Sequence, residues 1–216
     1  MRLYCISDCH LGDGSKSDDF KNDTWLISLC EKVSQEEGAL LVINGDFFEC
    51  WQSRFHQIVN AHKEAVQRLA SMKKDTVVLI KGNHDGEWCM DLFGRMLDIH
   101  VFDKYQIGDI LFMHGHQFDE VNSRFKWIGR AVSWIGGMLE RCIDKDIDIR
   151  FNELAMWITG TGRHGGEKYM RAAVDYTRDK PGVNVIVLGH THEFFDGVIY
   201  KNTGTGIKKE VLELWV

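Results

Sequence analysis

Acidic, amide and imidazole side chains gather in five short patches along the chain. In order, the patches are Asp8-Cys9-His10, Gly45-Asp46, Gly82-Asn83-His84-Asp85, His114-Gly115-His116 and Gly189-His190-Thr191-His192. They offer two carboxylates, one amide and four imidazoles as candidate metal ligands: Asp8, His10, Asp46, Asn83, His114, His190 and His192. Oxygen and nitrogen ligands without a thiolate suit Mn, Fe, Zn or Co better than a purely structural zinc site. Two such cations about 3.5–4 Å apart can polarise a phosphoryl oxygen and lower the pKa of a shared water, which is hydrolytic chemistry.

Each patch directly follows a short apolar run, and these runs would position the candidate ligands. The runs are LYCIS, LLVIN, TVVLIK, DILFM and VNVIVL, a composition that predicts buried strands ending in loops. Five strand ends of one sheet can converge on one edge, where open α/β sheets bind ligands. If the extended chain continues past the strand end, Asp8 and His10 face the same side, and so do His190 and His192. Tight turns beside the ligands would be supplied by Gly45, Gly82, Gly115 and Gly189.

The remaining patterns predict one α/β domain with an insertion. Strands are predicted over residues 2–7, 39–44, 76–81, 99–102, 104–107, 110–114, 184–188, 194–200 and 207–215, and helices over 18–36, 54–73 and 87–97. The alternation of strand and helix in the first part implies parallel strands with right-handed crossovers. Gly108-Asp109 predicts a hairpin, and the last two strands look antiparallel. Residues 118–180 carry a helical apolar stripe, so we expect one domain over 1–216 with a helical cap at about 118–180.

Bulk composition limits the class of protein further. The 216 residues carry a net charge of −6 and have a pI of about 5.9, which argues against a stable nucleic-acid complex. The six cysteines form no C-x-x-C pair, which favours reduced thiols in a cytoplasmic protein. We expect no membrane-spanning helix, because no apolar stretch reaches 18 residues, and no signal peptide, because the N-terminus runs straight into a strand.

The ordered series D-x-H, G-D, G-N-H-D, H-G-H and G-H-T-H is similar to the motifs of the calcineurin-like metallophosphoesterase superfamily. The resemblance covers nearly the whole chain apart from the expected cap, and it implies a two-sheet α/β sandwich flanked by helices with a dinuclear metal centre. By that resemblance one cation is held by Asp8, His10 and His192, the other by Asn83, His114 and His190, and Asp46 bridges the two. The implied cofactors are two divalent cations, Mn²⁺ first, with Fe, Zn, Co or Mg as alternatives.

The same resemblance implies the reaction. It is hydrolysis of a phosphodiester or diphosphate by a hydroxide held between the two metals. His84 would not be a ligand. It would touch the phosphate and stabilise or protonate the leaving oxygen, a role that suits an imidazole titrating near neutral pH. His84 and Asp46 are therefore the expected catalytic residues.

Finer features resemble the UDP-2,3-diacylglucosamine diphosphatase group. These features are the S-D-x-H-L-G opening at Ser7–Gly12, the H-G-H-Q-F-D patch at His114–Asp119 and the helical insertion. They imply a small phosphorylated substrate that is lipid-linked, and peripheral contact with a membrane. The chain departs from the group at His84, where those enzymes usually carry Arg, so the reaction class transfers better than the substrate.

Three other interpretations stay open. A nucleotide or nucleic-acid phosphodiester is a second substrate class, although the acidic pI counts against long duplex DNA. A phosphoprotein is a third, and the cap should hinder a folded substrate. The alternative from another class is an inactive scaffold or interaction protein, which disagrees with a ligand set in which none of the seven positions is missing.

Several further residues have two interpretations each. His116 either reaches phosphate or metal, or supports a ligand by a hydrogen bond. Arg163, in a glycine-rich stretch at 159–166, is a candidate phosphate contact, while the stretch itself resembles a lid hinge. Asp85 and Glu49 are expected to be structural or supporting acids. His56, His62 and His100 are expected to be surface or packing residues, and Trp127 and Trp134 either receive acyl chains or pack on the core.

Overall fold

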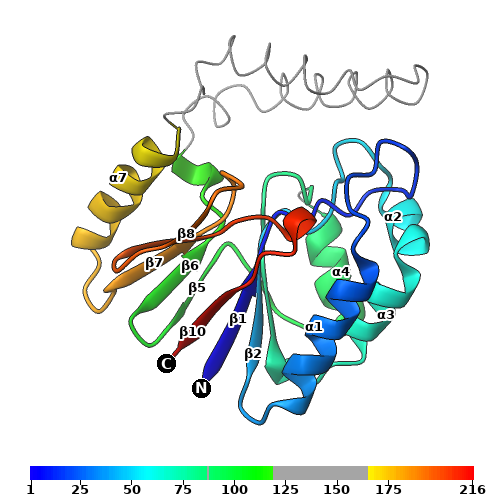
Figure 1. Cartoon of the computed structure of the whole chain (residues 1–216), viewed down its shortest axis with the longest axis horizontal. Coiled ribbons are helices and arrows are strands. Elements are labelled where there is room, and N and C mark those ends of the chain that lie inside the picture. Colours follow the sequence, from blue (N-terminus) through cyan, green and yellow to red (C-terminus); the bar gives the residue numbers. More distant parts are fainter. Residues whose placement is uncertain (87, 119–164) are drawn as a thin grey trace.

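Two β-sheets pack face to face between layers of helices (Figure 1). The computed structural model describes residues 1–86, 88–118 and 165–216. The first sheet has the order β10-β1-β2-β3-β4 and the second β5-β6-β7-β9-β8. This architecture confirms the predicted α/β sandwich. It corrects the expectation that all five ligand-bearing strands share one sheet, because three lie in the first sheet and two in the second.

The first sheet is mostly parallel. Its strands are β1 (Arg2–Ile6), β2 (Leu40–Asn44), β3 (Val77–Ile80), β4 (Val101–Phe102) and β10 (Leu212–Trp215). Strands β1 to β4 pair in parallel, as the strand–helix alternation predicts. Strand β10 pairs antiparallel with β1. The carboxyl ends of β1, β2 and β3 therefore meet at one edge.

The second sheet is mixed. Its strands are β5 (Lys104–Ile107), β6 (Ile110–Met113), β7 (Val185–Leu188), β8 (Phe194–Asp196) and β9 (Tyr200–Thr203). The predicted hairpin at Gly108-Asp109 joins β5 to β6. The two last predicted strands are not partners of each other: residues 194–203 fold into the β8–β9 hairpin, and β10 crosses to the first sheet.

Strand alternation divides the core into layers. In β1, Leu3 and Cys5 face the second sheet, while Tyr4 and Ile6 face the helices. The inter-sheet layer continues with Val42 and residues of β6 and β7. Every residue of β2 is buried, which explains its continuous apolar sequence.

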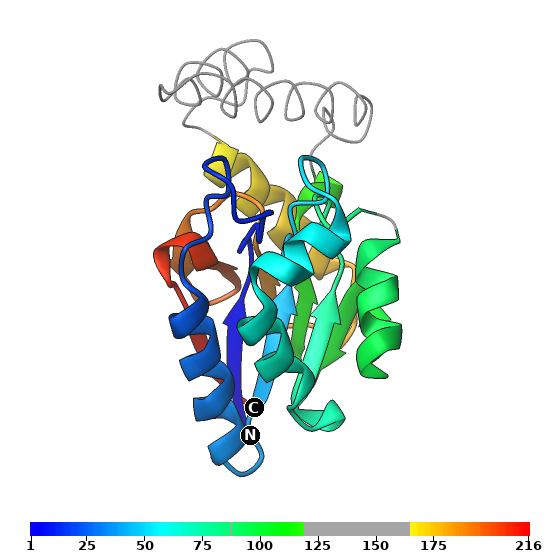
Figure 2. The same cartoon turned by 90° about the vertical axis from the view of Figure 1, so that its right-hand side faces the viewer.

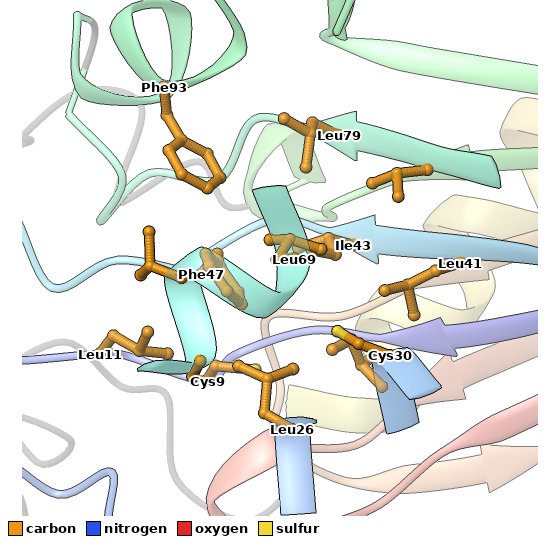
Figure 3. Packing of buried hydrophobic residues seen from close by; sticks show 14 of the residues in the cluster. Cys9, Leu11, Leu26, Cys30, Leu41, Ile43, Phe47, Leu69, Leu79 and Phe93 are labelled. Atoms are coloured by element: carbon orange, nitrogen blue, oxygen red, sulfur yellow. The ribbon is translucent and has the colours of Figure 1, made fainter. Parts of the chain in front are cut away.

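The helices are α1 (Asp23–Gln35), α2 (Phe55–Ala61), α3 (Lys63–Ala70), α4 (Cys89–Leu97) and α7 (Gly165–Arg178), with short 3₁₀ turns at Lys74–Thr76, His116–Phe118 and Gly206–Lys208. Helices α1 to α4 cover the outer face of the first sheet, and α7 covers that of the second (Figure 2). Figure 3 shows side chains from α1, α3 and α4, including Leu26, Leu69 and Phe93, in one cluster with Ile43 of β2, which lies beside Leu69. None of the described helices is both long and apolar enough to cross a membrane.

Two predicted helices differ from those observed, and buried polar contacts explain both cases. Helix α1 begins at Asp23 instead of residue 18, because Asp18 accepts hydrogen bonds from the backbone N–H groups of Gly12, Gly14 and Phe20 and shapes a loop. The helix predicted over 54–73 breaks at His62, whose φ and ψ are −107° and 33°. The His62 side chain is buried against Asp18 and Asp23.

The expected cap is described only at its C-terminal end. Residues 165–178 form α7, whose Ala173 is fully buried against the second sheet. The helical stripe of the sequence, with Trp127 and Trp134, lies outside the described residues, and so does Arg163 of the glycine-rich stretch. A cap over residues 119–164 therefore stays a prediction.

Candidate metal centre

The five patches converge where the carboxyl ends of β1, β2 and β3 meet those of β6 and β7. Three groups bring their ligand atoms within 4.8 Å of one another: Asp8, His10 and His192 in the first, Asp46, His114 and His190 in the second, and His10, Glu49 and His84 in the third. The first two groups combine residues from both sheets, and the third comes from the first sheet alone. The resemblance implied the first of these groups, but it joined Asn83 to His114 and His190 and made Asp46 the bridge, and this assignment to metals stays a prediction. His190 and His192 belong to different groups although they are two residues apart.

Left-handed backbone conformations, not extended ones, aim these side chains. Among the described non-glycine residues, seven have positive φ, and five of them are candidate ligands: Asp8 (50°), His10 (50°), Asp46 (49°), His190 (69°) and His192 (56°). Each such residue costs on the order of 1–3 kcal/mol, and strain of this kind clusters at functional sites. The expectation that an extended chain aligns Asp8 with His10 is therefore wrong. Instead, their N–H groups donate to the carbonyls of Gly45 and Asp46, each at 3.0 Å, and these bonds hold the turns in place.

In the first group, a buried carboxylate faces two imidazoles. Asp8 is fully buried, and its Oδ1 lies 3.2 Å from Nε2 of His192. Nε2 of His192 lies 3.3 Å from Nε2 of His10. The backbone N–H of His190 donates to Asp8 Oδ2 at 3.0 Å. Burial opposes ionisation of Asp8, but the imidazoles of His114 and His192 outweigh it and lower its pKa to about 2.

In the second group, Asp46 faces His114. Nδ1 of His114 donates to the carbonyl oxygen of Asn44 at 2.8 Å, which directs Nε2 toward Asp46 Oδ2, 3.0 Å away. Burial opposes protonation of His114, but the carboxylates of Asp46 and Asp8 outweigh it and raise its pKa to about 10. The same ion pair, with a contribution from His84, holds the pKa of Asp46 well below its usual range despite burial. The buried carboxylate of Asp46 therefore requires a positive partner, and protonated His114 has that role in this structure.

Asp8 connects the first two groups, and the neighbouring patch adds the oxygen of Asn83. Asp8 Oδ1 of the first group lies 3.9 Å from His114 Nε2 of the second. Asp46 also accepts the N–H of His84 at 2.7 Å through Oδ1. Asn83 Oδ1 is buried, and no group in the described part of the chain donates a hydrogen bond to it. A buried carbonyl oxygen without a donor is costly unless another electropositive partner satisfies it.

These observations fit a pair of divalent cations. Two imidazole nitrogens 3.3 Å apart can share only one proton, whereas a cation accepts lone pairs from both. Buried carboxylates within reach of these nitrogens and the orphaned oxygen of Asn83 complete an oxygen and nitrogen donor set. Such a set suits Mn, Fe, Zn or Co.

Beside the ligands, Glu49 holds two imidazoles in place. Glu49 Oε2 lies 2.9 Å from Nδ1 of His10 and 2.8 Å from Nδ1 of His84. Burial opposes its ionisation, but His84 and His10 lower its pKa to about 2. In turn, burial opposes protonation of His84, and the charges of Glu49 and Asp46 raise its pKa to about 9. The ring of Trp51 stacks on His84, with centroids 3.8 Å apart. His84 is thus a positioned, protonated imidazole at neutral pH.

Asp85 links the loops that carry the candidate ligands by hydrogen bonds. It is fully buried and accepts hydrogen bonds from the N–H groups of Asp46, Phe48 and Gly82. Burial and the nearby charge of Asp46 raise its pKa to about 7, against the effect of those N–H groups. The sequence interpretation of Asp85 as a turn acid matches this contact pattern.

Two glycines are required by close packing at the ligands. A Cβ on Gly45, whose φ is +88°, would lie 2.5 Å from Nδ1 of His114. A Cβ on Gly82 would overlap Oδ1 and the backbone nitrogen of Asp46. Any larger side chain at either position would push a candidate ligand out of place.

A model of the calcineurin-like phosphoesterase family matches residues 1–194 of the chain, and so spans most of it, including all seven candidate ligands. The chain belongs to this family. Its members are hydrolases that act on phosphoester bonds and typically bind divalent metals. The UDP-2,3-diacylglucosamine subgroup is not distinguished by this match. No curated protein sequence matches the chain.

Two solved structures are similar to this calcineurin-like phosphoesterase over most of its length. A Staphylococcus aureus protein assigned as a 5′-nucleotidase, in complex with α-ketoglutarate, is 14% identical with a TM-score of 0.40. The alignment covers 94% of this chain and 48% of that one, so the chain spans about half the length of that protein. The calcineurin-like phosphoesterase YfkN from Bacillus subtilis is 12% identical with a TM-score of 0.46, over 96% and 82% of the two chains.

The structure also places residues that the sequence interpretation assigned less firmly. The ring of His116 lies 5.6 Å from that of His114 and 6.4 Å from that of His190, so it borders the second group. Arg163 lies outside the described residues. His62 proves to be a buried ion-pair partner, not an ordinary surface or packing residue.

Sequence reasoning missed Asn44 and Trp51. Asn44 is fully buried at the end of β2, and its Nδ2 donates to the carbonyls of Met113 and Val187 in the second sheet, at 3.2 and 3.3 Å. The sequence did contain a signal for Asn44, because an amide at the end of an otherwise apolar strand indicates a buried polar residue with hydrogen-bond partners. No comparable signal distinguishes Trp51 from the other tryptophans.

Proposed function

We propose that this chain is a phosphodiesterase or diphosphatase that works with two divalent cations, Mn²⁺ first among them. One cation would be held by Asp8, His10 and His192, the other by Asn83, His114 and His190, with Asp46 bridging. The observation that carries the proposal is the pair of convergent donor groups, which share buried carboxylates and lie beside a positioned imidazole.

The cations, when bound, would neutralise phosphoryl oxygens and lower the pKa of a water that attacks phosphorus. The residues of the chain do the rest. Glu49 and Trp51 fix the ring of His84, and the carboxylates keep that ring protonated below about pH 9. His84 would donate its proton to the leaving oxygen and stabilise charge on the phosphate. Asp46 orients His84 through its backbone N–H.

The substrate is proposed to be a small phosphorylated compound. A lipid-sugar diphosphate of the UDP-2,3-diacylglucosamine type is supported only by the sequence resemblance, as is peripheral membrane contact. A cytoplasmic location is supported only by the cysteine pattern of the sequence. A nucleotide phosphodiester fits the same reacting groups. Both substrates contain a phosphorus atom with two ester or anhydride oxygens, which the proposed chemistry requires.

The test replaces Asp46 by Asn and measures Mn²⁺-dependent hydrolysis of bis(p-nitrophenyl) phosphate. Loss of a bridging charge should remove several kcal/mol of transition-state stabilisation, roughly a thousand-fold in kcat/KM. The matched control is Asp175→Asn on the exposed face of α7, which should keep full turnover. Unchanged turnover in Asp46→Asn would contradict the proposal. Purified wild type without bound metal and without Mn²⁺-dependent stabilisation would instead favour an inactive scaffold.

A further inference from the structure

Two cysteines from separate parts of the chain meet beside Gly86. Cys50 lies in the loop that follows β2, and Cys89 is the first residue of α4. A Cβ placed on Gly86 would lie 3.3 Å from Cβ of Cys50 and 3.5 Å from Sγ of Cys89, so both side chains border the same small space. Both thiols are free. No candidate metal ligand is a thiol, so the metal chemistry described above does not account for this pair.

The pair is accessible to a small molecule. Both cysteines line a cavity of about 620 Å³ that opens between the loop after β2 and the start of α4. This volume is far larger than the roughly 30 Å³ that a water molecule occupies. Cys50 is itself partly exposed. By contrast, three other described cysteines are fully buried and do not line the cavity, namely Cys5, Cys9 and Cys30. A small polar oxidant can therefore reach the pair of Cys50 and Cys89 more readily than those thiols.

The surroundings of Cys89 favour its thiolate. The thiol of Cys50 donates a hydrogen bond to Sγ of Cys89 and lowers the pKa of Cys89, against burial and the charge of Asp85. Cys89 also begins the nine-residue helix α4, where backbone N–H groups without helical partners stabilise an anion. The thiolate is the form of cysteine that oxidants attack, and a second thiol beside it can resolve the oxidised product. Cys89 is thus suited to react first and Cys50 to react second.

Cys50 is placed where a new covalent bond would affect the candidate metal centre. Its neighbours in the chain are Glu49, which holds the rings of His10 and His84, and Trp51, which stacks on His84. The backbone N–H of Cys50 donates to the carbonyl of His84 at 3.0 Å. An S–S bond of about 2.0 Å is shorter than a hydrogen-bonded contact between two sulfurs, so closing it would draw this loop toward α4. Glu49 and Trp51 would move with the loop.

We propose that Cys50 and Cys89 are a peroxide-sensitive thiol pair, which closes to a reversible disulfide and thereby lowers turnover at the metal centre. The effect on turnover rests on the proposed function, whereas formation of the disulfide does not. Disulfides in reducing compartments are usually transient and redox-sensing, which agrees with two thiols that are free in this structure.

The reaction has two steps. Sγ of Cys89 attacks one oxygen of hydrogen peroxide, so an S–O bond forms, the O–O bond breaks, and the leaving hydroxide takes up a proton to become water. Sγ of Cys50 then attacks Sγ of Cys89, the S–S bond forms, and the S–O bond breaks. The second hydroxide leaves as water with the thiol proton of Cys50. The two sulfurs lose two electrons to the peroxide, and a dithiol such as dithiothreitol reverses the result.

Mass spectrometry of the metal-free full chain tests the pair directly. After treatment with hydrogen peroxide and its removal by catalase, a non-reducing digest of wild type should contain the peptides of Cys50 and Cys89 joined by a bond that dithiothreitol cleaves. Cys50→Ser lacks the second thiol, so dimedone, which traps sulfenic acids, should label Cys89. Cys89→Ser should leave Cys50 reduced and unlabelled. Far-UV circular dichroism checks that both variants fold.

The matched control is Cys30→Ala, because Cys30 lies in α1 and does not line the cavity. This variant should still form the joined peptide. A wild type without that peptide would overturn the proposal. So would dimedone labelling of Cys50 in Cys89→Ser together with unlabelled Cys89 in Cys50→Ser.

Turnover of bis(p-nitrophenyl) phosphate tests the second part of the proposal. Oxidised wild type, loaded with Mn²⁺ after the peroxide is removed, should lose roughly ten-fold in kcat/KM, as expected when supporting partners of ligands are displaced. Dithiothreitol should restore it, and Cys50→Ser should keep full turnover before and after the same treatment. Full turnover in wild type that carries the joined peptide would overturn the control of turnover by this pair.

The two measurements also separate this proposal from the proposed function. If the peptides join but neither form of the protein shows Mn²⁺-dependent turnover, the thiol pair stands and the proposed function fails. If turnover depends on Asp46 but the peptides do not join, the proposed function stands and the thiol pair fails.

Discussion

The two sheets contribute different chemistry to the candidate metal centre. The first sheet supplies every oxygen donor, from Asp8, Asp46 and Asn83, together with the imidazole of His10. The second sheet supplies imidazoles alone, from His114, His190 and His192. The carboxylates therefore belong to one sheet and most of the candidate imidazole ligands to the other. The group of Asp8, His10 and His192 and the group of Asp46, His114 and His190 each need both sheets, so these two groups form only when the sheets pack.

The groups that orient the imidazoles differ in the same way. In the first sheet a carboxylate, Glu49, binds His10 and His84. In the second sheet His114 is oriented by a backbone carbonyl, and that carbonyl belongs to Asn44 of the first sheet. The first sheet thus orients imidazole ligands of both sheets.

The largest expected difference in Mn²⁺ affinity is between variants of two ligands of the first group, Asp8 from the first sheet and His192 from the second. Asp8→Asn should weaken Mn²⁺ binding at least roughly a hundred-fold, because it deletes a fully buried charge that desolvated cations need. His192→Ala should weaken Mn²⁺ binding only about ten-fold, because the His192 side chain is 44% exposed and a water molecule can replace its nitrogen. The Mn²⁺-induced rise in Tm, titrated against metal concentration, measures both. A larger loss of Mn²⁺ affinity in His192→Ala than in Asp8→Asn would contradict the division between the carboxylates of the first sheet and the imidazoles of the second.

Glu49→Gln tests the carboxylate that orients the first-sheet imidazoles. Such supporting partners are typically worth about 10–100-fold in activity. His84 has a pKa raised to about 9, so it is protonated below that pH and loses its proton above it. Without the charge of Glu49 this pKa falls, and the alkaline limb of kcat/KM against pH should move to lower pH. Glu64→Gln on the exposed face of α3 is the control. An unmoved limb would show that Glu49 does not act through His84.

Asn44 connects the two sheets by hydrogen bonds, so replacing it should lower the free energy of unfolding. Asn44→Ala deletes two buried hydrogen bonds to the carbonyls of Met113 and Val187, which should cost about 2 kcal/mol of unfolding free energy. Asn184→Ala removes an exposed amide bonded to Asp109 and should cost less than about 0.5 kcal/mol. Urea denaturation of the metal-free proteins measures the difference. Equal costs would mean that packing alone joins the sheets.

The same comparison shows what the sequence could reveal. The candidate ligands and their strands were predictable, because apolar runs followed by Asp, Asn or His report both burial and chemistry. The division into two sheets was not, since pairing partners such as β1 and β10 lie about two hundred residues apart in the chain. The left-handed turns at Asp8 and His190 were also hidden, because only long-range contacts stabilise that conformation in residues other than glycine.

Replacement of His62 should have the smallest effect on stability, and this effect should be confined to the helices that cover the first sheet. Burial opposes its protonation, but hydrogen bonds to Asp18 and Asp23 raise its pKa. Its contribution to stability is therefore complete below the unfolded pKa of about 6.5 and is lost as pH rises through the raised folded value. His62 in turn lowers the pKa of Asp18, against burial, so that contribution is lost only as pH falls through the folded pKa of Asp18.

His62→Gln should flatten the decline of Tm above about pH 6.5, whereas His100→Gln, at an exposed position, should not. Turnover of bis(p-nitrophenyl) phosphate at neutral pH should stay close to wild type, because His62 touches no candidate ligand among its hydrogen-bond partners. A variant that lost both the pH dependence and the Mn²⁺-induced rise in Tm would show that the helical layer is coupled to the ligand loops. Asp18 would be the carrier of that coupling, since it binds His62 on one side and the N–H of Gly12, two residues beyond His10, on the other.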